Sequence, residues 1–119
     1  MDRRRVMLAY MEANRLMLTG NPGIPATIMN TFIGVVIWGY QAKQEALPLR
    51  ELAERVGMPA STLSRHLRYL GSFERQGVPG CGWVRLYEWE ECRRQKIVKL
   101  TRAGQAMAES LQRIFERAV

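Results

Sequence analysis

The sequence predicts a mainly α-helical protein with one small β-hairpin, which is an α+β fold. The chain has 119 residues, a length that suits one domain with a modest core. Most of it spaces apolar residues as helices do, with glycine and proline between the helical segments. Residues 83–89 instead alternate as a strand does, and residues 95–100 offer a second strand. We expect a single domain over 1–119, with N-terminal helices over 1–47, a helix pair over 48–73, a hairpin over 83–100 and a C-terminal helix over 101–119.

The first part of the chain predicts two helices. Residues 2–19 form the first, and the turn-forming residues 20–23 end it. Its imperfect apolar stripe consists of Met7, Leu8, Met11, Leu16 and Leu18. Residues 25–44 form the second helix, with Pro25 in its first turn. Because this second helix is apolar on almost every side, we expect it to be buried from most directions.

The middle of the chain predicts two short helices joined by a tight turn, over residues 49–56 and 59–70. Each helix gathers its apolar residues on one face: Leu52, Ala53 and Val56, then Leu63, Leu67 and Leu70. Ala53 is small enough for the helices to cross closely, and Gly57 suits the left-handed residue that ends a helix. This pattern predicts a helix-turn-helix, whose second helix lies in the major groove of DNA.

The second helix of this pair should present hydroxyl and arginine side chains to DNA. The expected groove-facing residues are Ser61, Thr62, Ser64, Arg65 and Arg68. Such side chains reach base edges and phosphates, and the backbone amides at the helix start attract a phosphate. The alternative is a pair of packed helices in which Ser61 is only a cap.

The predicted hairpin is basic at one end. A loop over residues 77–82 precedes it, and residues 90–94 form its turn. The turn would carry Arg93 and Arg94, and the return strand carries Lys96 and Lys99. A basic hairpin beside a recognition helix can enter the neighbouring minor groove, which attracts arginine. The alternative is a solvated turn with ordinary surface charges.

A final helix over residues 102–117 completes the prediction. Thr101 should cap its start. Its expected buried stripe consists of Ala103, Met107, Leu111 and Ile114.

The charge of the chain points to a polyanionic partner. The chain has eighteen basic and eleven acidic residues, which gives a net charge of +7. Residues 55–73 and 93–108 contain basic residues and no acid, so two basic patches could form one footprint. Nucleic acid fits best, and an acidic membrane surface comes second. Fifteen of the basic residues are arginine, which suits phosphate and guanine but also follows from GC-rich codons.

Other classes of protein fit the sequence less well. Residues 16–42 carry no charge, but polar and turn-forming residues interrupt them, so a buried helix of a cytoplasmic protein fits better than a membrane span. Cys81, Cys92 and the single His66 do not form a zinc pattern, and we expect no metal or cofactor. His66 is interpreted as a partly buried packing residue, and a redox role for Cys92 is the weaker reading. No catalytic arrangement is recognisable, so we expect no enzyme.

Two segments carry a resemblance to a known family. Residues 94–106, Arg-Gln-Lys-Ile-Val-Lys-Leu-Thr-Arg-Ala-Gly-Gln-Ala, are similar to the second wing strand and following helix of winged helix-turn-helix regulators of the MarR type. Residues 61–67, Ser-Thr-Leu-Ser-Arg-His-Leu, resemble the recognition helix of winged helices generally. The resemblance covers about residues 48–110. Arg94 matches the arginine of that family's Asp-x-Arg wing motif, whereas Cys92 stands at the position of the aspartate.

The resemblance implies a homodimer that binds palindromic DNA and represses transcription by occupying a promoter. Residues 2–19 and 102–117 would form the dimer, and Arg93, Arg94 and Lys96 would grip the DNA backbone or minor groove. Members of the family often bind small aromatic effectors, although Trp38, Trp83, Tyr87 and Trp89 fit core and wing packing better than a ligand pocket. The alternative function is a winged helix without DNA binding, which would contact another protein through its aromatic hairpin or methionine-rich first helix.

Overall fold

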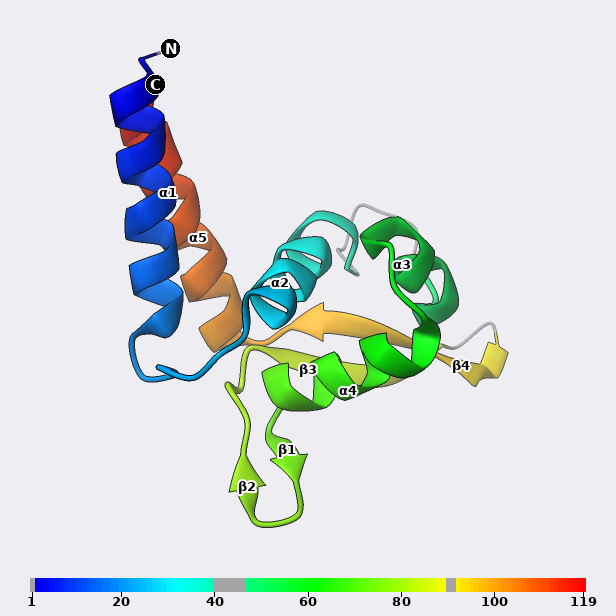
Figure 1. The fold of residues 1–119 in the computed structure, drawn as a ribbon. Helices are drawn as coiled ribbons and strands as arrows, with labels where there is room; N and C mark the ends of the chain where they lie inside the picture. The colour runs from blue at the N-terminus through cyan, green and yellow to red at the C-terminus, as the bar shows by residue number, and fades with distance from the viewer. Residues whose placement is uncertain (1, 40–46, 90–91) are drawn as a thin grey trace.

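The computed structural model describes residues 2–39, 47–89 and 92–119, with the backbone alone at 73–75 and 92–94. Its elements confirm the predicted class, because helices predominate and the strands form only small antiparallel pairs (Figure 1). In chain order they are α1 (Arg3–Leu18), α2 (Ala26–Trp38), α3 (Leu49–Val56), α4 (Ala60–Leu70), β1 (Phe73–Arg75), β2 (Val78–Pro79), β3 (Val84–Trp89), β4 (Cys92–Leu100) and α5 (Arg102–Ala118).

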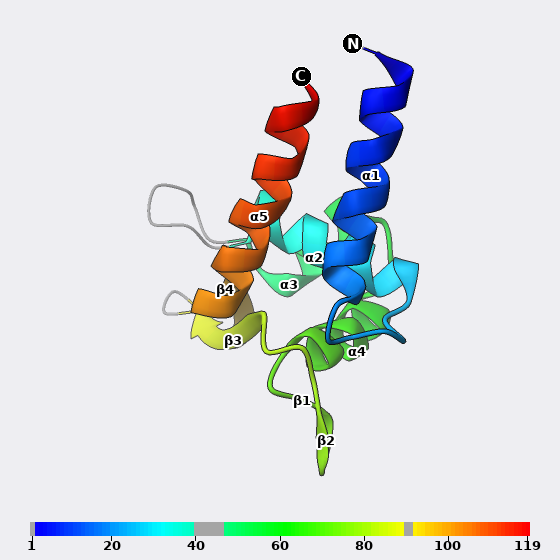
Figure 2. The ribbon, with the colours of Figure 1, turned by 90° about the vertical axis from the view of Figure 1, so that its left-hand side faces the viewer.

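Helices α1 and α5 pack side by side and project from the rest of the molecule, with both chain ends at their far tip (Figures 1 and 2). Asp2 caps α1 by accepting a hydrogen bond from the amide of Arg4. As predicted, Thr101 caps α5, where its hydroxyl accepts a hydrogen bond from the amide of Gly104 at 3.1 Å. The same hydroxyl donates to the carbonyl of Gly82 at 2.6 Å, so the cap also joins α5 to the segment before β3.

The predicted buried stripe of α1 is wrong for its first half. Ala9, Ala13 and Met17 are the buried residues, and the small Ala9 packs against Ile114 and Ala118 of α5. The larger apolar residues Met7, Leu8 and Met11 are instead exposed by 58%, 41% and 42%, with Leu8 at the edge of the groove between α1 and α5. An expected core face of α1 is therefore an uncovered apolar surface.

The buried stripe of α5 begins one residue later than predicted. Ala103 is exposed, and Gly104 is buried in its place. A side chain at Gly104 would collide with the carbonyl oxygen of Trp83, so only glycine fits there. Leu111 and Ile114 are buried as predicted.

Helix α2 is the central element of the body, in contact with α3, α4 and β4. Pro25 is its N-cap, and Gly39 ends it at Trp38 by adopting an extended conformation. The prediction ran to residue 44, and residues 40–44 lie outside the described part of the chain. Gly34 packs directly against Val56 of α3, so its lack of a side chain permits the close approach of the two helices.

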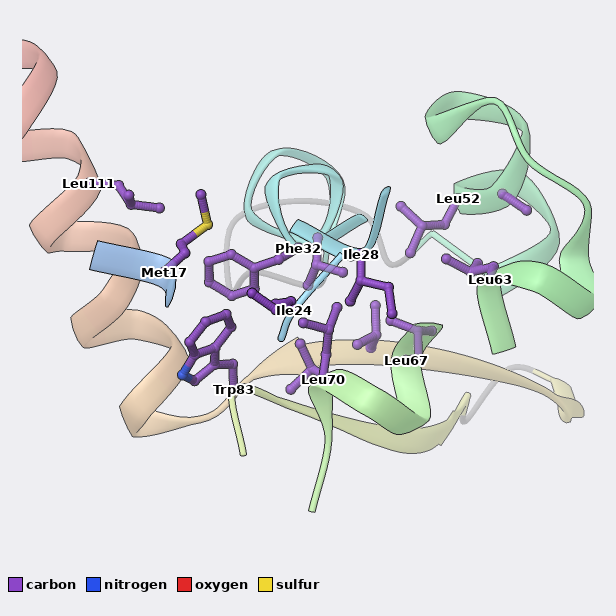
Figure 3. Packing of buried hydrophobic residues seen from close by; sticks show 14 of the residues in the cluster. Met17, Ile24, Ile28, Phe32, Leu52, Leu63, Leu67, Leu70, Trp83 and Leu111 are labelled. Carbon is purple, nitrogen blue, oxygen red and sulfur yellow. The ribbon is translucent and has the colours of Figure 1, made fainter. Parts of the chain in front are cut away.

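The main core lies between α2, the α3–α4 pair and the β3–β4 sheet (Figure 3). Phe32 is fully buried at its centre, and its ring centroid lies 4.9 Å from that of Trp83 at an interplanar angle of 53°. Trp83 is thus a core residue rather than part of a ligand pocket. None of the helices within the described ranges is long and apolar enough to cross a membrane.

Strands β3 and β4 form the predicted hairpin, with Val84 opposite Leu100 and Glu88 opposite Lys96. The predicted turn is too long, because β4 begins at Cys92 and pairs there with Trp89 after an irregularity in the register. Arg93 and Arg94 therefore lie in the strand and not in the turn.

A second, smaller hairpin overlaps the start of residues 77–82, which the sequence predicts to be a loop. Strands β1 and β2 pair between Phe73 and Pro79 and project beyond α4 (Figures 1 and 2). Gly77 has a φ of 80°, which provides the tight turn between them. The strands are only three and two residues long, which is too short for sequence alternation to reveal them.

Candidate nucleic-acid interface

Helix α4 is held on the body by three leucines. Leu63, Leu67 and Leu70 are spaced for one helix face and are exposed by at most 2%. They point into the core from α4 in Figure 3. The opposite face of α4 is consequently turned to solvent.

This outer face carries most of the residues predicted to contact DNA. Four of them are exposed: Ser61, Ser64, Arg65 and Arg68. Thr62 is half-buried at the edge of the face, and its hydroxyl lies 3.5 Å from an Nη atom of Arg65. The outer face therefore combines two hydroxyls and two guanidinium groups, which can donate to both phosphates and base edges.

The start of α4 leaves its first amides directed outward. Pro59 is the N-cap, and no side chain within the described residues makes a capping hydrogen bond there. Ser61 lies inside the helix, so its predicted alternative as the cap is wrong. An uncapped helix start bears a partial positive charge and attracts anions such as phosphate.

The turn before α4 has the geometry that the sequence predicted. Gly57 adopts the left-handed conformation, with φ 85° and ψ 41°. The amides of Gly57 and Met58 both donate to the carbonyl of Ala53, at 2.8 and 3.0 Å. These two bonds close α3 and redirect the chain into α4, which gives the helix-turn-helix its fixed angle.

The other end of α4 is fastened by residues 80–83, which we call the strap. The amides of Cys81, Gly82 and Trp83 donate to the carbonyls of Tyr69, Gly71 and Leu70, at 2.8–2.9 Å. Gly80 lies so close that a side chain there would collide with the carbonyl oxygens of Gly71 and Tyr69. The strap satisfies carbonyls that a helix end leaves without partners. The sequence does not predict the strap, since a glycine-rich segment gives no sign of what it packs against.

The β3–β4 hairpin carries the remaining predicted contact residues. Lys96 is exposed and lies opposite Glu88, so one opposite charge stands beside it. Arg93 and Arg94 occupy the start of β4, next to the end of the hairpin. Their backbone is placed there, and their side chains are outside the described part.

The outward face of the hairpin pairs two cations with an aromatic ring. Lys99 Nζ and the guanidinium carbon of Arg85 lie 4.6 and 5.5 Å from the ring centroid of Tyr87. Arg85 and Lys99 are direct cross-strand neighbours, an arrangement that repulsion disfavours. The ring of Tyr87 offsets this repulsion by attracting both cations.

His66 lies at the inner edge of α4 and is half-buried, as the sequence interpretation proposed. Its Nδ1 is 2.8 Å from the hydroxyl of Thr31, a fully buried residue of α2. Burial, and secondarily the charge of Arg65, lower the pKa of His66 below its usual value of 6.5. Thr31 was not singled out in the sequence, although a threonine in an almost wholly apolar helix was a usable signal.

Comparisons with known proteins agree with this geometry. A sequence model of the IclR helix-turn-helix domain matches residues 41–78, which include α3 and α4. No curated protein matches the chain.

Solved structures with a similar fold include several regulators. The S. aureus MepR–DNA complex is 20% identical, with a TM-score of 0.66 over 96% of this chain and 82% of that one. A mutant E. coli MarR complexed with operator DNA is 20% identical, with a TM-score of 0.58 over 97% and 77% of the two chains. The PcaV transcriptional regulator from Streptomyces coelicolor is 19% identical, with a TM-score of 0.59 over 98% and 73%. The chain thus has the winged-helix fold of MarR-type regulators, as its sequence resemblance predicted.

Proposed function

We propose that the protein is a sequence-specific, double-stranded DNA-binding transcriptional regulator that represses by occupying its promoter as a homodimer. The observation that carries this proposal is the outer face of α4, where exposed hydroxyl and arginine side chains lie on a helix fastened at both ends. A rigid helix with such a face suits the major groove. Two similarly folded proteins solved with DNA, MepR and MarR, support the same use of the fold.

In this proposal some of the contact residues bind base edges and others bind the DNA backbone. Residues near the start of a recognition helix contact base edges in helix-turn-helix proteins, which assigns base contacts to Ser61, Ser64 and Arg65. Thr62 supports Arg65 from the edge of the face. Arg68 follows one turn later and would contact phosphate. Arg93, Arg94 and Lys96 of the hairpin would grip the backbone or the neighbouring minor groove.

The dimer would form through α1 and α5. Helix α1 exposes Met7 and Met11 away from α5 and Leu8 at the edge of the groove between the two helices, and Tyr10 is exposed by 62%. Phe115 and Val119 add exposed apolar surface on α5. A clustered apolar surface of this kind marks a contact site. A two-fold axis through it would place two recognition helices on successive major grooves, which explains how a domain of this size could read a palindrome.

The experiment is a selection of duplexes from a random DNA pool, followed by fluorescence titration. We expect one selected sequence to bind more tightly than random duplex by about 10³-fold or more. Affinity should fall steeply with salt, because arginine and lysine contacts release counterions from DNA. An unrelated acidic polymer, such as polyglutamate, controls for plain charge attraction. Absence of any salt-dependent duplex binding would contradict the proposal.

The exposed apolar face of α1 also favours a second candidate, a protein-interaction module without DNA binding. A monomer that uses Met7, Leu8 and Met11 against another protein would expose the same surface. Sedimentation of the protein without DNA separates the two candidates, since the regulator should be a dimer and the module a monomer. The module should also fail to bind DNA in the titration.

A further inference from the structure

The hydroxyl of Thr31 is a polar group inside an apolar core. Among the described residues, Thr31 is the one buried polar side chain, and it is fully buried. Its oxygen lies 2.8 Å from His66 Nδ1 in α4 and 3.1 Å from the Thr27 carbonyl in its own helix. The sulfur of Met58, in the turn between α3 and α4, lies 3.8 Å away. Because a buried hydroxyl costs free energy without hydrogen bonds, these contacts constrain how α4 sits against α2.

The His66 ring, the Thr31 hydroxyl and the Thr27 carbonyl form a chain of hydrogen bonds with one direction. A hydroxyl has one hydrogen and two lone pairs, so Thr31 can donate to the Thr27 carbonyl while it accepts the Nδ1–H of His66. In this arrangement the Thr31 hydroxyl, the Thr27 carbonyl and His66 Nδ1 each have a partner. The bond from His66 therefore joins the recognition helix to α2 at a definite angle, which apolar contacts do not specify.

The surroundings of His66 make this bond the main constraint on its ring. A groove of about 520 Å³ lies beside it, lined by Thr27, Met58, Thr62 and His66 itself among others. Packing therefore leaves space on one side of the ring, and the hydrogen bond supplies the orientation. His66 directly follows Arg65 and lies one turn after Thr62, so it stands where the buried and outer faces of α4 meet.

We propose that the His66–Thr31 hydrogen bond sets the rotation of α4 about its own axis and thereby aims Arg65 and the hydroxyls at the DNA bases. The three leucines of α4 hold the helix to the core, but apolar burial is non-directional and does not by itself specify the rotation of the helix. A rotation moves the outer side chains across the base edges while their charge remains near the phosphates. His66 is thus a positioning residue for sequence recognition, an inference that rests on the proposed function.

The test compares the wild type with Thr31→Val, which has nearly the same shape and no hydroxyl. Affinity for the selected duplex should fall by about three- to tenfold, the usual size of one hydrogen bond. Affinity for random duplex and the salt dependence should remain unchanged, because no charge is altered. A merely structural role would lower both affinities together, in proportion to the unfolded fraction.

Further variants provide controls. Thr31→Ser keeps the hydroxyl and should restore discrimination. Thr19→Val is a control for the loss of a threonine hydroxyl elsewhere, because the exposed Thr19 hydroxyl at the C-cap of α1 donates to the carbonyl of Arg15 at 2.9 Å. His66→Phe should reproduce the effect of Thr31→Val, and the double variant should lose no more than either alone. His66→Asn keeps a polar atom at the δ position and should retain part of the discrimination.

The outcomes separate this inference from the proposed function. Failure of the wild type to bind duplex DNA overturns the proposed function and the inference with it. If the wild type binds duplex DNA and a folded Thr31→Val or His66→Phe variant discriminates between selected and random duplex as well as the wild type does, only the inference is overturned. Additive losses in the double variant would also overturn it. Circular dichroism at the assay temperature establishes that each variant is folded, and His66→Phe provides the test if Thr31→Val is not.

Discussion

Arg65 and Arg68 both lie on the outer face of α4, but their positions along the helix differ. Arg65 is at the middle of the helix, near Thr62, and Arg68 is in its last turn, next to the strap. We expect Arg65→Ala to change sequence preference by about 1–3 kcal/mol at one base position, because a guanidinium that pairs with a base edge is lost. Repeating the selection from random DNA measures this change. An unaltered preference would mean that Arg65 contacts only phosphate.

Arg94 has a different expected role, since it lies at the start of β4 and not on the recognition helix. Arg94→Ala should weaken binding to all sequences alike and reduce the salt slope by about one unit, as for a lost phosphate contact. Titration of selected and random duplexes at several salt concentrations measures both effects. Arg50→Ala, which removes an exposed arginine of α3 to which no contact is assigned, is a matched control for charge alone. An effect of Arg94→Ala confined to one sequence would contradict the assigned role.

His66 should make folding stability depend on pH. Its pKa in the folded protein lies below the usual 6.5, so the unfolded chain takes up a proton first as the pH falls. The contribution of His66 to the free energy of unfolding should therefore be complete above about pH 7 and decline as the pH falls through 6.5. The decline should level off once His66 is protonated in the folded protein too. Urea unfolding between pH 5 and 8 measures this trend. His66→Asn should lack this component, and an equal decline in that variant would assign it to other groups.

The strap is the element that fastens the end of the recognition helix, and Gly80 is the position where it approaches most closely. Gly80→Ala would force a methyl group against the carbonyls of Gly71 and Tyr69, so residues 80–83 must shift. We expect a loss of about 1–3 kcal/mol in the free energy of unfolding, as for overpacking elsewhere. Gly23→Ala is the control, because a side chain there meets nothing within 4 Å. Equal stability of the two variants in urea would show that the strap adapts freely.

The elements could be predicted from sequence where local chemistry determines them. Gly57 and Thr101 define a helix end and a helix start through their own backbone or side chain, and both predictions are confirmed. The outer face of α4 also followed from periodicity, because Leu63, Leu67 and Leu70 fix the inner one. The strap, the β1–β2 hairpin and the Thr31–His66 bond could not be predicted, since each depends on which distant backbone or side chain lies nearby.

The arrangement of the whole molecule explains why the predicted buried face of α1 is wrong in its first half. Helix α1 has two apolar sides, and the sequence pattern does not tell which one meets α5. The small Ala9 takes that place, so the larger Met7, Leu8 and Met11 remain exposed. In Figure 2, α1 and α5 rise together away from α4, and a partner placed on them would leave the recognition helix uncovered.

A second copy on this surface predicts a specific effect of charge. Met11→Lys should weaken dimerisation by tenfold or more (about 1.4 kcal/mol or more), because a two-fold axis through this surface brings two lysines into one apolar contact. Ile37→Lys is the matched control, since Ile37 is also exposed, by 49%, but lies on α2. Sedimentation equilibrium measures the dimer constant. Met11→Lys should also bind a palindromic duplex less tightly while its affinity for one half-site is unchanged, because each recognition helix is intact and only their linkage is lost. A dimer that tolerates this lysine would place the two-fold contact elsewhere.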